Sequence, residues 1–137
     1  MKFARITFFV ASIYGFVSIA PLYFMEKLIG QSVPPVITHS EYFYGFLGVT
    51  LAWQAAYLVI SRDPARYRAL MIPIALEKLL TTVAFVVLYA QNRLSLSELG
   101  PSLIDPVFLM LFVIAFARIG DPGSHVKSKA SYSTSNS

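Results

Sequence analysis

Residues 69–92 read ALMIPIALEKLLTTVAFVVLYAQN, and this stretch decides the class of the protein. It is long enough to cross a hydrocarbon core, which takes roughly 20 mostly apolar residues, and only Glu77 and Lys78 interrupt it. Three further stretches have the same character: residues 6–25 and 42–61 carry no charge, and residues 102–117 carry only Asp105. The sequence therefore predicts four membrane-spanning helices, at about residues 6–28, 42–61, 68–91 and 102–119.

The composition of the whole chain points the same way. Of the 137 residues only 13% are charged and the mean hydropathy is +0.64, whereas soluble domains carry about 25% charged residues. We expect an all-α integral membrane four-helix bundle over residues 1–120, followed by a disordered cytoplasmic tail at 121–137. The absence of cysteine excludes disulfides and thiol redox chemistry. We expect no cofactor.

The distribution of Lys and Arg predicts the orientation of the bundle. Eight of these residues fall at one end of the predicted helices: Lys2, Arg5, Arg62, Arg66, Arg68, Arg118, Lys127 and Lys129. Only Lys27 and Arg93 fall at the other end. We therefore expect an antiparallel up-down bundle in a bacterial inner membrane with both termini in the cytoplasm. The basic residues then serve topology and contact with the lipid bilayer, and we expect no binding to nucleic acid.

Two features predict how the helices pack. Gly48, Ala52 and Ala56 lie four residues apart, and small side chains let helix backbones approach closely in lipid. We expect this face to pack against another helix, although an alanine-rich helix also shows such spacing by chance. The connection at residues 62–69 is short, which predicts that the second and third helices are antiparallel neighbours.

Glu77 and Lys78 are the strongest anomaly in the sequence. Two charges at a helix centre cost about 5–7 kcal/mol on insertion scales, and the apolar residues of this helix return roughly 3–7 kcal/mol. Such residues usually face the bundle interior. Counting from the connection places Gln54 level with Glu77 and Trp53 level with Lys78, with Tyr14 at a similar depth. We expect Lys78 either to extend towards the cytoplasm or to lie over the Trp53 ring, because neighbouring helix positions point about 100° apart.

This polar layer has two interpretations. In the first, it binds a proton or a small ligand; in the second, it is a hydrogen-bonded clamp that holds helices together. A separate group of charged residues, Glu26, Lys27, His39, Glu41 and Asp105, is expected at the outer ends of the helices, where the spacing matches no metal-ligand motif. We expect solvated loop ends and helix caps there, and no metal.

The predicted plan resembles the DoxX-like small bacterial membrane proteins. The likeness rests on the charged start of the first helix, on Gly45-Phe46-Leu47-Gly48, on the basic turn Arg62-Asp63-Pro64-Ala65-Arg66-Tyr67-Arg68 and on a third helix beginning near Leu70. It covers residues 1–120 and implies four short helices. That family includes subunits of membrane oxidoreductases, but no catalytic residue of the family can be matched here.

The function expected first is therefore that of an accessory or interaction subunit, with a membrane protein partner or a second copy of the chain. The alternative is a small-molecule or proton-coupled binder or transporter that uses the Glu77/Gln54 layer. An enzyme comes third, because the sequence holds no phosphate-binding loop and no motif of a catalytic nucleophile or zinc hydrolase.

Overall fold

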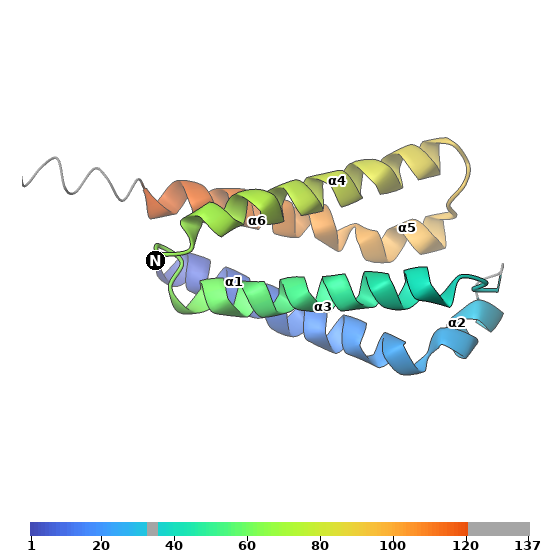
Figure 1. The fold of residues 1–137 in the computed structure, drawn as a ribbon. Helices are drawn as coiled ribbons and strands as arrows, with labels where there is room; N and C mark the ends of the chain where they lie inside the picture. Colours follow the sequence, from blue (N-terminus) through green and yellow to red (C-terminus); the bar gives the residue numbers. More distant parts are fainter. Residues whose placement is uncertain (33–35, 121–137) are drawn as a thin grey trace, which may run out of the picture.

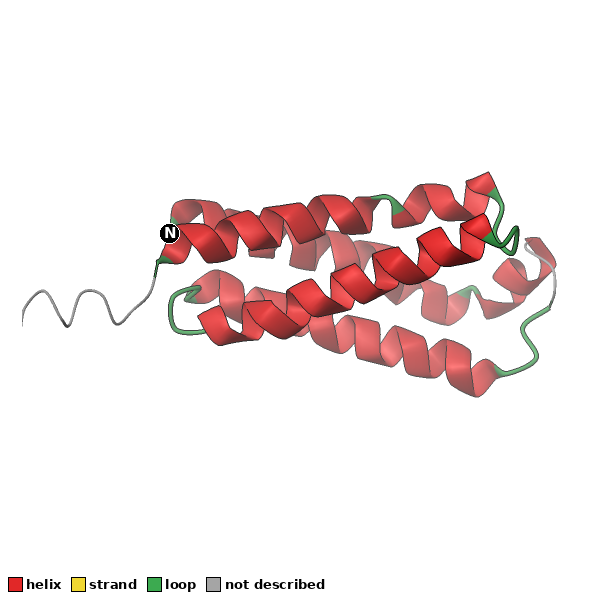
Figure 2. Ribbon diagram, turned by 90° about the horizontal axis from the view of Figure 1, so that it is seen from above, coloured by secondary structure: helices red, strands yellow, loops and turns green. Residues whose placement is uncertain are grey.

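The computed structural model describes residues 1–32 and 36–120, without the side chains of 97–99. Helices make up nearly all of this part of the chain (Figure 2). They are α1 (Lys2–Ile19), the 3-10 helix η1 (Ala20–Phe24), α2 (Glu26–Ser32), α3 (Ser40–Arg62), the 3-10 helix η2 (Arg68–Leu70), α4 (Met71–Ala90), α5 (Leu96–Ser102) and α6 (Ile104–Ile119). The predicted tail at 121–137 lies outside the described residues.

Four helical segments within the described residues are long and apolar enough to cross a membrane, as predicted: Lys2–Phe24, Ser40–Arg62, Arg68–Ala90 and Gly100–Ile119. The first segment differs from the expected 6–28 because its α-helix ends at Ile19 and a 3-10 turn follows. Pro21 stands at the start of that turn, and proline lacks the N–H that an α-helix needs to continue. The short helix α2 is then separate.

The helices form two pairs, α1 with α3 and α4 with α6, and α1 joins the pairs by packing against α6 (Figure 1). The predicted neighbourhood of the second and third helices is wrong: within the described residues α3 and α4 make no extensive contact. The end of α3 and the start of α4 lie close together at the connection after Arg62, and the two helices diverge towards the far end of the bundle (Figure 1). The cavity described below separates them.

The start of α1 and the end of α6 lie at one end of the bundle (Figure 1). There the guanidinium of Arg118 lies over the Phe3 ring, 4.7 Å from its centroid. Gly120 ends α6 with a φ of 68°, as its position after the last apolar residue predicts. Asp63 accepts a hydrogen bond from the Arg66 backbone N–H at 3.3 Å, as a capping residue does, although the following helix begins only at Arg68.

The core is centred on three aromatic rings in the half of the bundle near the termini. Phe8 stacks on Phe112 with centroids 4.5 Å apart, and the Tyr57 ring meets both edge-on. Outside this cluster most large apolar side chains are exposed. A soluble monomer rarely leaves so much apolar surface uncovered, so the surface fits a bundle surrounded by lipid.

The close helix contact lies on α1, not on the predicted face of α3. Gly48 and Ala52 are exposed and Ala56 is half-buried, and a Cβ at Gly48 would meet only the Tyr23 hydroxyl, at 3.5 Å, so within the described residues this face is largely uncovered. Gly15 of α1 is buried instead, because the side chain of Gln54 lies against its backbone. A Cβ at Gly15 would come within 2.1 Å of Gln54 Oε1.

Candidate functional site

A cavity of about 440 Å³ lies between the α1–α3 pair and the α4–α6 pair. It begins at the middle of the bundle and extends into the half away from the termini. The lining combines polar side chains with aromatic rings and comes from every long helix: Tyr14, Gly15, Ser18, Phe46, Thr50, Gln54, Tyr57, Glu77, Lys78, Thr81, Phe85, Ser102, Asp105 and Phe108 are among these residues.

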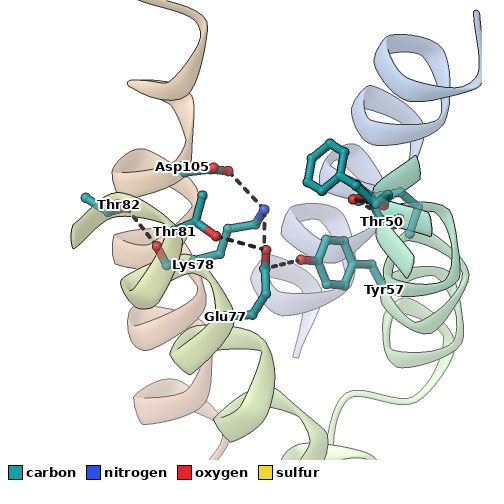
Figure 3. A network of polar contacts seen from close by, with 9 residues as sticks. Thr50, Tyr57, Glu77, Lys78, Thr81, Thr82 and Asp105 are labelled. Atoms are coloured by element: carbon teal, nitrogen blue, oxygen red, sulfur yellow. Dashed lines mark hydrogen bonds and ion pairs between the residues drawn. The ribbon is translucent and has the colours of Figure 1, made fainter. Parts of the chain in front are cut away.

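Three charged side chains meet at the cavity wall (Figure 3). The Lys78 Nζ lies 2.9 Å from Asp105 Oδ1 on α6 and 3.4 Å from Glu77 Oε2 on its own helix. The expectation that Lys78 extends to the surface or covers Trp53 is therefore wrong. Glu77 and Lys78 do meet, because the long flexible lysine side chain bends back across the helix surface.

Asp105 is the residue that sequence reasoning missed. It was assigned to the outer surface as a cap of the fourth helix, but the N-cap position of α6 is Leu103 and no side chain caps that helix. Asp105 lies in the first turn of α6, with its side chain only 18% exposed, facing Lys78. The positive end of the helix dipole also favours a carboxylate there. The sequence signal for Asp105 is Lys78, because a lysine within a membrane-spanning helix is expected to pair with an acidic residue, and Asp105 is the acidic residue of the fourth apolar stretch.

Glu77 is held less tightly than Asp105. Its carboxylate accepts hydrogen bonds from Tyr57 OH at 3.5 Å and from Thr81 Oγ1 at 3.4 Å, both at the long limit for such bonds. Its side chain is 30% exposed, against 12% for Lys78. Glu77 is therefore the charged group of the cluster that is most open to the cavity.

The other predicted site residues have separate positions. Gln54 is buried and lines the cavity, but its Nε2 donates to the Thr50 carbonyl oxygen at 3.2 Å instead of to Glu77. Tyr57, one turn further along α3, occupies the predicted place opposite Glu77. The count failed because it assumed that α3 and α4 lie side by side.

Tyr14 lines the cavity and packs against Phe108, with ring centroids 5.7 Å apart. Trp53 packs against the core cluster instead. Of the five predicted residues, Glu77, Lys78, Gln54 and Tyr14 thus share one cavity, and Trp53 belongs to the packing of the bundle.

The cluster has a definite charge. With all three groups ionised, two carboxylates and one ammonium leave one negative charge. The nearby Tyr57 and Thr81 hydroxyls donate hydrogen bonds but bring no positive charge. This arrangement can hold one proton or one cation, and it offers no positive group free to bind an anion.

The charged residues expected at the far end form local contacts. Glu26 accepts hydrogen bonds from Ser40 Oγ and from Tyr44 OH at 2.8 Å, which tie α2 to the start of α3. These two bonds lower the pKa of the Glu26 carboxyl. His39 Nδ1 lies 3.2 Å from Glu41 Oε1. Among the described residues no group of three metal-ligating side chains comes together.

Comparisons with known proteins add no relative: no family model matches the chain, and neither does any curated protein or solved structure.

Proposed function

We propose that this protein binds a small molecule within the membrane, in the cavity beside Glu77. The observation that supports this best is the open space at the ion cluster. A cluster that served only as a clamp would close its helices together, whereas here α3 and α4 diverge and leave about 440 Å³. Cavities of about 300–1,000 Å³ with a few polar groups among apolar walls are typical of ligand sites.

The proposal includes the location of the protein. The excess of Lys and Arg at the end that carries the termini supports a bacterial inner membrane with that end in the cytoplasm. The cavity then occupies the outer half of the bundle, and a ligand reaches it from the outer side or from between α3 and α4. A role in transport follows if the cavity also becomes accessible from the cytoplasm.

The chain offers a clean test because it contains no cysteine. We expect Thr81→Cys, in the cavity wall, to react with N-ethylmaleimide in membranes, since a thiol reacts as its thiolate and needs water to ionise. Leu80→Cys is the matched control, because the neighbouring Leu80 is 60% exposed on the outer surface, which faces lipid in this proposal. The Thr81 thiol should react at least about tenfold faster.

A second pair of variants on the opposite wall makes the test independent of α4. Thr50→Cys lines the cavity, and Val49→Cys points outward from α3. Full reaction of all four variants in detergent at denaturing temperature shows that the thiols are intact. If both cavity thiols react as slowly as their lipid-facing neighbours, water does not enter the cavity and the proposal fails.

A second proposal is the role of an accessory subunit, and the exposed small face of α3 favours it. Gly48 and Ala52 are exposed in the described part of the chain, so they leave a surface on which another helix fits closely. As part of the same proposal, the chain is related to the DoxX-like proteins, which include subunits of membrane oxidoreductases. Purification in mild detergent tests it: wild-type protein should elute as a complex or a homo-oligomer, and Gly48→Leu as the free monomer.

A further inference from the structure

We infer that the ligand of this cavity is a singly charged organic cation, whose charge pairs with the Glu77 carboxylate. This inference rests on the proposed small-molecule site and names the class of its ligand. It follows from the charges of the cluster, from the distances between them and from the aromatic wall.

The first step is to decide which carboxylate lacks a partner. Lys78 Nζ lies closer to Asp105 than to Glu77, at 2.9 Å against 3.4 Å. Asp105 also lies in the first turn of α6, where the helix dipole stabilises a negative charge. Lys78 and Asp105 therefore neutralise one another, and the uncompensated negative charge belongs to Glu77.

The second step considers every titratable group that lines the cavity with Glu77. Within the described residues these are Lys78 on α4, Asp105 on α6, Tyr57 on α3 and Tyr14 on α1. A tyrosine side chain supplies no positive charge in either protonation state. No further positive charge comes from the protein at this position in the described structure.

The third step is the cost of the remaining charge. At membrane depth a carboxylate without a full counter-charge is unfavourable, and Glu77 shares its one ammonium neighbour with Asp105. A bound cation supplies the missing positive charge and pairs with the Glu77 carboxylate.

The wall of the cavity selects an organic cation over a metal ion. Five aromatic rings of the described residues line it, those of Tyr14, Phe46, Tyr57, Phe85 and Phe108. Aromatic ring faces attract ammonium groups, and the rings also form apolar contacts with the carbon atoms of an organic ligand. A metal ion such as Ca²⁺ needs six to eight oxygen ligands at about 2.3–2.6 Å. The volume of about 440 Å³ suits a larger ligand.

The experiment uses benzyltrimethylammonium, which carries a permanent charge and no proton of its own. Calorimetric titration of the full chain in an uncharged detergent measures the affinity. We expect saturable binding of one benzyltrimethylammonium per chain.

Three controls make the result specific. Benzyl alcohol and benzoate present the same ring without charge or with a negative charge, and each should bind at least about tenfold more weakly. Glu77→Gln should lower the affinity for benzyltrimethylammonium at least about tenfold. Glu41→Gln, which alters an exposed carboxylate outside the cavity, should leave that affinity unchanged.

Asp105→Asn keeps the inference testable if Glu77→Gln does not fold. It leaves Glu77 and Lys78 as a neutral pair, so the cation affinity should be lost. Stronger binding of benzyl alcohol or benzoate than of the cation, or no binding of any probe, overturns the inference. If Thr81→Cys still reacts quickly in those cases, a small-molecule site remains and only the cation assignment fails; if it reacts slowly, the site itself is absent.

Discussion

Replacing Lys78 by methionine tests whether the ion cluster holds the two helix pairs together. Methionine keeps most of the length of the side chain and removes its charge, so Glu77 and Asp105 are left without their shared partner. At 2.9 Å and an effective dielectric constant of 20, the attraction between Lys78 and Asp105 is about 6 kcal/mol. Taking the ions out of water opposes this by several kcal/mol each.

The net effect follows from that balance. Removing one member of a buried ion pair typically destabilises a protein by about 3–5 kcal/mol, and Lys78 is 12% exposed and Asp105 18% exposed. We expect Lys78→Met to lower the free energy of unfolding by about 3 kcal/mol, near the lower limit because the Glu77 side chain is 30% exposed. Reversible unfolding in mixed detergent micelles, followed by circular dichroism, measures this value.

The double variant separates charge from packing. Lys78→Met with Asp105→Asn leaves a single carboxyl group, which a proton neutralises, so at least about half of the lost stability should return. The loss in Lys78→Met should also shrink at low pH, where the carboxylates are protonated. Equal stability of Lys78→Met and wild type, or an unchanged loss in the double variant, would refute the electrostatic account.

Three further predictions concern other parts of the molecule. Gly15→Leu should destabilise the protein by about 1–3 kcal/mol, because any side chain there meets Gln54, whereas the exposed Gly48→Leu should change unfolding of the monomer by less than about 0.5 kcal/mol. Glu26 has a lowered pKa in the folded protein because of its bonds to Ser40 and Tyr44. The folded state therefore binds fewer protons than the unfolded state, and the stabilisation present at neutral pH is lost as the pH falls below about 4. Hydrogen exchange in α2 should show this loss in wild type and not in Glu26→Gln. Alkaline phosphatase inserted at residues 30–40 should be active, and a fluorescent protein fused after residue 137 should be bright; the reverse pattern contradicts the proposed orientation.

The sequence predicts the helices well because a membrane-spanning helix is a local property. Length and apolar composition alone locate the four apolar segments, and Gly120 marks the end of α6. The first segment is the exception: its α-helix ends at Ile19, two residues before Pro21, and not near residue 28. These features depend only on neighbouring residues along the chain.

The packing could not be predicted to the same degree, because it depends on which faces meet. Small residues at a spacing of four occur both on α3, at Gly48, Ala52 and Ala56, and on α1, at Ala11 and Gly15. The structure uses the α1 stripe, with Gly15 against Gln54. Spacing alone does not distinguish a face that packs within the chain from one that is left on the surface.

The sequence predicts that α3 and α4 are neighbours along their length, and this prediction fails at the candidate site, where the cavity lies between them. A short connection normally produces adjacent helices, but here the facing surfaces carry Tyr57 on one side and Glu77 with Lys78 on the other. Packing these surfaces together along their whole length would bury the partly exposed Glu77 carboxylate further, which is costly. Divergence of the two helices avoids that cost and leaves the Glu77 side chain beside the cavity. The short connection brings α3 and α4 together at one end, and the polar residues near the middle of α4 favour their separation at the other.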